Sequence, residues 1–356
     1  MSKPYPLLPL GIAALLLLCV VGSGGGAPEA PGAPPVARPA KLTIGYIPTI
    51  TVMQVGAVQE QGWFQQELGV PVEYVRFVAG TPLLQALAAG QVDVAYVGFG
   101  PALTGAHQRV PAKVVAVNSK DAYGFAASAA FAALWAKQPT AAAFKEFQRQ
   151  EGRRLRIASF PKWSAPDAWL RYWLTGLGVD PAREVEIVGM GEDRLVTAVV
   201  SGQLDGAFIL EPLVTLILRR DPAKFTPIVW SRDIRSNQLA QVVLVKQSLI
   251  DQYPEMMERL VKIQMQATRL LKEDREFWAQ VSVKYLQGLS LEDARVAVNS
   301  PAANLASNLR DVAPSVLLFD RFMVQEGVYP SQITIDDLVD FRFYDRVVQK
   351  HPELND

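Results

Sequence analysis

The chain has 356 residues and half of them are hydrophobic, so it has apolar side chains enough for about two domains. Lysine plus arginine and aspartate plus glutamate number 35 each, which gives no electrostatic reason to expect nucleic acid or an anionic membrane surface as a partner. With two histidines and one cysteine, the chain cannot form a Cys/His zinc site or an internal disulfide. We expect no metal and no cofactor.

The first 40 residues have the pattern of a targeting segment followed by a linker. Lys3 precedes an apolar run over 7–21, which is short for the roughly 20 residues of a membrane-spanning helix. We predict an export signal over 1–21, with an uncleaved signal anchor as the alternative. Residues 22–40 are mostly Gly, Ala and Pro and have too few apolar side chains to offset ordering entropy, so we predict a flexible tether.

Cys19 ends the leucine run and has two interpretations. Its position resembles that of the lipidated cysteine of a lipoprotein signal, although such signals usually have a small residue where this chain has Leu18. The alternative is an apolar cysteine that is removed with the leader. Both interpretations place the mature protein outside the cytoplasm, in the periplasm or at the outer face of the cytoplasmic membrane. Only an N-terminal anchor would then join it to a membrane.

From residue 41 the pattern predicts an α/β unit. Strands alternate with helices, and the helices end at Gly69 and Gly90. The sequence GFGP at 98–101 starts a further helix. This β-α-β-α-β order implies a parallel sheet with right-handed crossovers. The predicted strands are 41–47, 72–77, 92–97 and 114–117, and the predicted helices are 52–68 and 82–89.

Three segments of this unit reappear in the same order, displaced by 113, 113 and 112 residues. Three collinear matches indicate a repeat rather than a coincidence of common patterns. Two similar lobes that face each other form a cleft, which is a preferred place for a small ligand. The matches are 42–48 with 155–161, 72–75 with 185–188, and 86–93 with 198–205. The second unit has strands at 155–159, 184–188 and 206–210, and helices at 165–177 and 192–200.

Two apolar runs, 125–135 and 239–245, are predicted as crossings between the units. The chain then leaves lobe one, builds lobe two and returns. A helix over 248–273, with caps at Ser248 and Asp251, and later helical segments would complete lobe one on its outer face. The predicted domains are lobe one at 41–126 and 243–356, and lobe two at 127–242.

Several short motifs between about 41 and 245 carry a family resemblance. They are IGYIP at 44–48, GWF at 62–64, ALAAGQVD at 86–93, GFGP at 98–101, GQLDGA at 202–207 and EP at 211–212. In combination they resemble the solute-binding proteins of ABC importers in the nitrate/sulfonate/taurine group, which includes binders of pyrimidine-type thiamine precursors. The resemblance implies a type II periplasmic-binding-protein fold, two hinge crossings and a ligand clamped between the lobes. It also implies a membrane permease and its ATPase as partners.

In lobe one, ligand contacts are expected beyond the carboxyl ends of the strands, where helix N-termini offer N–H groups and positive potential to an anion. Gly80 and Thr81 form a candidate anion loop, with a plain N-cap as the alternative. A similar loop follows the next strand, and its phenylalanine is a candidate apolar wall. The candidates in that loop are Gly98, Phe99 and Gly100. Tyr46, which could equally be a rim aromatic, and Thr49 are candidates from the first loop.

In lobe two, the matching loop contains Trp163, Ser164 and Ala165. Trp163 could cover the ligand, and Ser164 could cap the helix with its hydroxyl near the cleft. Lys162 could pair with an anion, although a solvated lysine is the more usual case.

Glu211 has two interpretations of equal weight. A cleft carboxylate would bind an amine, amide or ring N–H and would favour taurine-like zwitterions or heterocycles over nitrate. Alternatively, Glu211 is a charge at the hinge or helix start, favoured by the helix dipole. Asp93 and Asp205, which are equivalent in the repeat, are interpreted as structural caps of the glycine turns.

The leading hypothesis is a monomeric binding component of an importer. It would capture a small anionic or zwitterionic organic solute, similar to a sulfonate, taurine or nitrate, by lobe closure. The alternatives are a binder of a pyrimidine-type precursor or other heterocycle, and a tethered sensor. An enzyme is disfavoured and no catalytic residue is predicted. No cysteine follows Cys19, and neither His351 nor His107, which is expected near the surface after a helix, lies in a predicted cleft loop.

Overall fold

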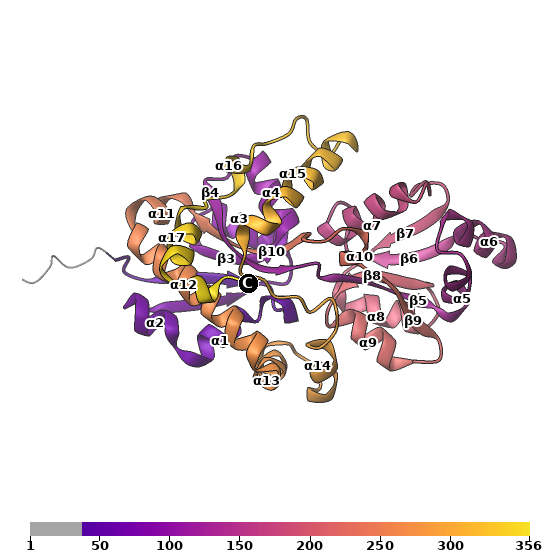
Figure 1. Ribbon diagram of the computed structural model, residues 1–356, viewed down its shortest axis with the longest axis horizontal. Coiled ribbons are helices and arrows are strands. Elements are labelled where there is room, and N and C mark those ends of the chain that lie inside the picture. The colour runs from indigo at the N-terminus through magenta and orange to yellow at the C-terminus, as the bar shows by residue number, and fades with distance from the viewer. Residues whose placement is uncertain (1–37) are drawn as a thin grey trace, which may run out of the picture. The chain divides into compact units, whose positions relative to one another are not determined.

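The computed structural model describes residues 38–356 (Figure 1). The predicted export signal, Cys19 and nearly all of the predicted tether lie outside the described residues. Within 38–356, no helix combines the length and the apolar character that crossing a bilayer requires.

Two five-stranded sheets form the centres of two lobes, and helices flank both sheets (Figure 1). This arrangement confirms the predicted two-lobed α/β fold. The first sheet has the order β2-β1-β3-β10-β4, with β1 Leu42–Tyr46, β2 Val72–Arg76, β3 Val94–Gly98, β4 Ala112–Lys120 and β10 Leu239–Lys246. The second has the order β7-β6-β8-β5-β9, with β5 Tyr123–Ser128, β6 Leu155–Ser159, β7 Val185–Gly189, β8 Gly206–Leu210 and β9 Phe225–Trp230.

Both sheets are mixed: the strands predicted for the two β-α-β units are parallel, as expected, and the strand that arrives from the other lobe is antiparallel to its neighbours. β1 is parallel to β2 and β3, but β10 runs antiparallel to β3 and β4. In lobe two, β5 is likewise antiparallel to β8 and β9. The reason lies in the crossings. The parallel strands end at the cleft, whereas β5 and β10 arrive from the other lobe and begin there, so they must run the opposite way.

The sequence repeat is also a repeat of hydrogen bonds. Leu42 lies opposite Val72 in lobe one, and Leu155 lies opposite Val185 in lobe two. The Asp93 carboxylate accepts a hydrogen bond from the Thr43 N–H at 2.9 Å. Likewise, the Asp205 carboxylate accepts one from the Arg156 N–H at 2.8 Å. Both aspartates are structural residues, as predicted, but their carboxylates bind the neighbouring strand rather than the glycine turn.

The chain passes between the sheets at 121–122 and returns over 231–238. The division at 126/127 and 242/243 that was expected from the sequence falls inside β5 and β10. The run 125–135 is also not a single strand. β5 ends at Ser128, whose hydroxyl accepts from the Phe131 N–H and starts a helix, because a serine N-cap outweighs the apolar pattern.

The two crossings are bonded to each other through Asp121. Its N–H donates to the Gln238 carbonyl at 2.8 Å, and its carboxylate accepts from the N–H groups of Asn237 and Gln238. Asp121 and Asn237 have φ values of 51° and 60°. Asp and Asn tolerate this left-handed region better than other non-glycine residues, so both residue types suit the crossing.

The helices that were predicted up to the second crossing are present, two of them with different bounds, and α5, α6 and α10 were not predicted. The helix predicted over 52–68 is divided at Gly62, which has a φ of 66°, and it ends at Gly69 as expected. α3 begins at Gly80 rather than at Pro82. These elements are η1 Ile50–Val52, α1 Gln54–Gln61, α2 Trp63–Leu68, α3 Gly80–Ala88, α4 Phe99–His107, α5 Ala129–Lys137, α6 Ala141–Glu151, α7 Ala165–Gly176, α8 Glu192–Val200, α9 Leu213–Arg220 and α10 Ser231–Ile234.

After β10, the helix predicted from 248 is divided before Pro254, since proline cannot continue the preceding helix. Ser248 and Asp251 therefore lie inside the first of the two helices and do not cap them. The later elements are α11 Gln247–Gln252, α12 Pro254–Glu273, α13 Arg275–Tyr285, α14 Leu291–Ala297, α15 Leu309–Gln325, α16 Ile335–Leu338, α17 Arg342–Lys350 and η2 Pro352–Leu354.

Most of the C-terminal helices pack on lobe one, as expected, and α12 lies against α1 and β4. α14 differs, because it contacts α9 of lobe two. Arg219 of α9 pairs with Asp293 of α14 at 2.6 Å and also with Glu292. The C-terminal region therefore connects to both lobes.

Candidate functional site

A cavity of about 530 Å³ lies between the two lobes. Lobe one contributes Thr49 and the starts of α3 and α4, and lobe two contributes the loop 160–166 before α7 and the start of α8. Residues near the crossings complete the wall, and they are Tyr123, Leu210, Ala240 and Gln241. The cavity thus occupies the place that the strand ends predicted.

Most of the predicted contact residues line this cavity. They are Thr49, Gly80, Thr81, Gly98, Gly100, Trp163, Ser164 and Ala165, and Lys162 lines it as well. Their contact with a ligand remains a prediction. Three other candidates, Tyr46, Phe99 and Glu211, do not line it.

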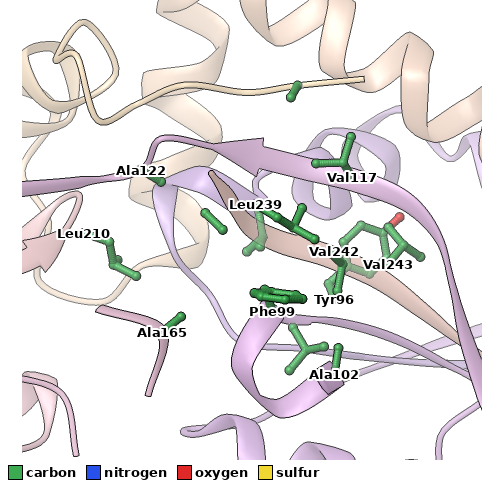
Figure 2. Packing of buried hydrophobic residues seen from close by; sticks show 14 of the residues in the cluster. Tyr96, Phe99, Ala102, Val117, Ala122, Ala165, Leu210, Leu239, Val242 and Val243 are labelled. Atoms are coloured by element: carbon green, nitrogen blue, oxygen red, sulfur yellow. The ribbon is translucent and has the colours of Figure 1, made fainter. Parts of the chain in front are cut away.

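Tyr46 and Phe99 belong to the core rather than to the cavity wall. Tyr46 is 8% exposed, and its ring meets that of Tyr285 with 6.5 Å between centroids. Phe99 is fully buried and lies edge-on to Phe319. Figure 2 shows Phe99 beside Tyr96 and Val242, with Ala165 of lobe two nearby. A large apolar side chain at a helix start gains more by packing behind the loop than by facing solvent.

Glu211 caps a helix and does not reach the cavity. It is fully buried, and its carboxylate accepts from the Thr215 N–H and the Thr215 hydroxyl, both at 3.1 Å. Burial raises the pKa of Glu211 to about 7, although the hydrogen bonds act in the opposite direction. This geometry favours the helix-start interpretation, since the carboxyl group lies at the first turn of α9.

Gly80 is required by packing within lobe one. A Cβ at this position would lie 2.3 Å from the Cγ of Pro101, so a side chain here would collide with the start of α4. The N-cap of α3 is Ala79, and Thr81 is an exposed residue of the first turn. The small residue at 80 thus brings two helix starts together, and both line the cavity.

The starts of α4 and α7 meet across the cavity. A Cβ on Gly100 would lie 3.3 Å from the backbone nitrogen of Ala165. The N-cap residues of these helices, Gly98 and Ser164, make no side-chain capping bond. The Ser164 hydroxyl is buried and has no hydrogen-bond partner within 38–356. Helix N–H groups and this hydroxyl are therefore available to a polar group of a ligand.

The positive potential at the start of α7 is already partly compensated. Asp167 is buried, accepts from the Trp163 N–H at 2.9 Å and pairs with Arg171 at 2.9 Å. Trp163 has a φ of 69°, and its ring lies near two cations, with Lys162 Nζ at 4.9 Å and the Arg171 guanidinium at 5.4 Å from the centroid. These contacts hold the indole at the cavity wall.

Sequence reasoning missed several polar residues of the wall, among them Gln241, Tyr123 and Glu192. Gln241 accepts from the Thr51 hydroxyl at 2.7 Å, and its amide donates to Thr49 Oγ1 at 3.0 Å. Tyr123 is 2% exposed, and burial raises the pKa of its hydroxyl. Both come from crossing strands, for which no local motif exists.

The third of these missed residues is Glu192, the first residue of α8. Glu192 is an exposed residue at the cavity, and the partial loss of hydration there raises its pKa to about 7, while Arg76 acts to lower it. The repeat displacement of 112 residues makes Glu192 the counterpart of Gly80, so the repeat itself was a usable signal.

His107 has intermediate exposure, and its side chain is 8% exposed. Its Nε2 lies 2.6 Å from the Asp320 carboxylate, and its ring stacks on Tyr329 with 3.6 Å between centroids. It does not line the cavity. Within 38–356, no group of three His, Cys, Asp or Glu side chains is arranged to hold a metal ion.

Relatives of this chain are named for binding and import. The taurine-binding periplasmic protein of Escherichia coli (strain K12) is 25% identical over 254 residues, covering 68% of this chain and 70% of the relative. The nitrate import ATP-binding protein NrtC of Synechococcus elongatus is 26% identical over 297 residues, covering 82% of this chain. The chain spans only 44% of the length of NrtC.

Solved structures with the same fold include the periplasmic nitrate-binding protein NrtA from Synechocystis PCC 6803. The TM-score is 0.71 at 15% identity, with 90% of each chain covered. This likeness shows that the protein has the periplasmic-binding-protein fold that the sequence predicted. The model of the NMT1-like family matches residues 36–285, which is more than two thirds of the chain. The chain therefore belongs to the NMT1-like family.

Proposed function

We propose that this protein is the extracytoplasmic solute-binding component of an ABC importer. The observation that carries the proposal is the 530 Å³ cavity that is lined by helix starts from both lobes. Relatives named for taurine binding and nitrate import support it. The function requires binding and lobe closure, in which a ligand shifts the population toward the closed state, and no catalytic step.

The proposed solute is a small organic anion or zwitterion of the sulfonate or taurine type. The helix starts at Gly100 and Ala165, with the free Ser164 hydroxyl, suit a polar or anionic head group. Most of the remaining wall is hydrocarbon and aromatic, which suits an apolar part of the solute. A bare nitrate ion would leave this part of the wall uncovered, so an organic solute is favoured over nitrate.

A pyrimidine-type or other heterocycle is the second candidate. Glu192 favours it, because a carboxylate that faces the cavity accepts a hydrogen bond from a ring N–H or an amine and repels an anion. Lys162 and Glu192 carry opposite charges and are the charged side chains of the described wall, so a zwitterion fits both.

The proposed setting is the periplasm or the outer face of the cytoplasmic membrane, with a permease and its ATPase receiving the solute from a monomer. Cys19 is either the lipidated anchor or part of the removed leader. In this proposal lobe one comprises about 38–120 with 239–356, and lobe two comprises about 123–230, because the sheets exchange strands at these points.

A thermal-shift screen with the purified protein tests the proposal. The panel is nitrate, taurine, alkyl and aromatic sulfonates, carboxylates and pyrimidines. A ligand that binds only the folded state raises the melting temperature by mass action. Ser164→Ala should reduce the shift for the responding class, and Ser248→Ala, on the distant helix α11, serves as the control. Loss of uptake of the responding compound in a deletion strain would support transport, and unchanged uptake would contradict it.

A further inference from the structure

Helix α15 is anchored to lobe one behind the cavity. It packs on β10 and β4. Its Ser315 hydroxyl accepts from the Leu239 N–H at 2.9 Å, next to the second crossing. Its buried Asp320 lies 2.6 Å from His107 at the end of α4. These contacts fix α15 to the sheet and to α4.

From this position α15 reaches lobe two with aromatic side chains. Phe319 is 2% exposed and lies between Phe99 of lobe one and Trp169 of lobe two, with ring centroids 5.2 Å and 5.3 Å away. One turn further along α15, Phe322 meets Tyr172 at 5.6 Å. A single phenyl ring thus contacts both lobes.

The two rings that Phe319 contacts belong to the helix starts that line the cavity. Phe99 is the first residue of α4, and Trp169 lies one turn into α7. On the cavity side, the same two helices meet at Gly100 and Ala165. The distance between the two helix starts is therefore set by the close contact of Gly100 with Ala165 on the cavity side and by the Phe319 ring on the opposite side.

The contact between Phe319 and Trp169 also has a feature that favours separation of the two lobes. The Trp169 indole N–H is buried and has no hydrogen-bond partner within 38–356. An unpaired buried donor costs free energy that is recovered when water reaches it. Packing of the Trp169 indole on Phe319 opposes that tendency.

We propose that Phe319 is a positioning residue for ligand binding. By spacing the α4 and α7 starts, it sets the equilibrium between open and closed lobes and so the affinity of the cavity. Phe319 does not itself line the cavity. The proposal rests on the proposed function only in that the cavity is the ligand site.

The test measures the distance between the lobes in the full chain. Cys19→Ser removes the native thiol, and spin labels are placed at Gln65→Cys of lobe one and Gln148→Cys of lobe two, both exposed. Double electron–electron resonance without ligand should give a broader distance distribution with a longer mean distance for Phe319→Leu than for the parent. Phe319→Ala should extend it further. Leu317→Ala, on the same helix but 39% exposed, is the matched control and should leave the distribution unchanged.

Affinity is measured in the same variants with taurine and MOPS as probes. Because a smaller closed fraction lowers apparent affinity in proportion, Phe319→Leu should weaken binding about tenfold, mainly through faster dissociation. A parental distance distribution and parental affinity in Phe319→Leu would overturn the proposal. If the distances change but the unmodified protein binds nothing in the solute panel, Phe319 still sets the spacing of the lobes, and the proposed function, with any role of Phe319 in affinity, fails. If Phe319→Ala does not fold, Phe319→Leu still decides.

Discussion

The two lobes begin in the same way and are completed differently. In each, an aspartate after a glycine turn accepts the N–H of the second residue of the first strand. In lobe one the partner of Asp93 is Lys246 at 2.6 Å, at the end of the returning strand β10. In lobe two the partner of Asp205 is Arg153 at 2.6 Å, two residues before β6. In lobe two the ion-pair partner of the aspartate is thus a residue next to the same unit, whereas in lobe one it belongs to β10, the strand that returns from lobe two.

The helix starts that face the cavity also differ between the two lobes, in the charge that they carry. Gly80 of lobe one packs on Pro101 and contributes no charge, whereas its counterpart Glu192 of lobe two brings a carboxylate to the wall. The repeat therefore preserves the positions of helix starts but not their chemistry. Lobe one supplies a neutral surface to the cavity wall, and lobe two supplies the charged side chains Lys162 and Glu192.

The largest expected effect comes from preventing the two lobes from meeting. Gly100→Val places a branched side chain against the Ala165 backbone, where even a Cβ would lie at 3.3 Å. We expect affinity for the responding solute to fall about a hundredfold, because the closed state becomes crowded. Isothermal titration calorimetry measures the affinity. Gly90→Val, at a turn of lobe one where a Cβ would meet no neighbouring atom, is the control for general destabilisation. Equal losses of affinity in both variants would contradict the role of the contact.

Glu211→Gln should change how stability depends on pH. The pKa of Glu211 is raised to about 7, so the folded state binds the proton more tightly than the unfolded chain. Stability is then highest below the ordinary glutamate pKa and falls as pH rises to about 7. The glutamine keeps an acceptor for Thr215 and removes this dependence, with a gain at pH 8 of at most about 3 kcal/mol. Denaturant unfolding at pH 5 and pH 8 measures it, and parallel curves for both proteins would refute it.

Matched substitutions at Asp93 and Asp205 should have different effects in the two lobes. Asp205→Asn weakens a local pair within lobe two, while Asp93→Asn releases Lys246 at the end of β10. Each should cost about 1–2 kcal/mol, since one partner of a half-buried ion pair is lost. Hydrogen exchange should show faster exchange in β6 for the first variant and in both β1 and β10 for the second. Faster exchange confined to β1 in Asp93→Asn would show that the returning strand does not depend on this pair.

The smallest expected effect concerns Glu192. Its pKa is raised to about 7, so the carboxylate becomes charged as pH rises through neutrality. Binding of a sulfonate should weaken about threefold between pH 6 and 8, and Glu192→Gln should remove this change. An N–H donor such as a pyrimidine should show the opposite trend. The sign of the pH dependence therefore distinguishes the two proposed solute classes, and a flat profile in the unmodified protein would remove Glu192 from the site.

Local patterns predicted the positions of helix ends and strands well. Gly69 and Gly202 end their segments as expected, because glycine adopts the left-handed conformation there at little cost. The same patterns placed Thr49, Gly100 and Ser164 at the cavity, since helix starts after parallel strands converge on one edge. They did not place Phe99 or Glu211, because the direction of a side chain at a helix start depends on what packs behind it.

By itself the sequence determined that two similar α/β lobes exist and where their strands, turns and helix starts lie, because spacing and turn residues act over a few positions. Only the tertiary structure decided that β5 and β10 run antiparallel, that Gln241 and Tyr123 reach the cavity, and that Phe319 separates the helix starts. Each of these outcomes depends on segments about 70 to 220 residues apart in the chain, and no local pattern encodes the energy of such packing.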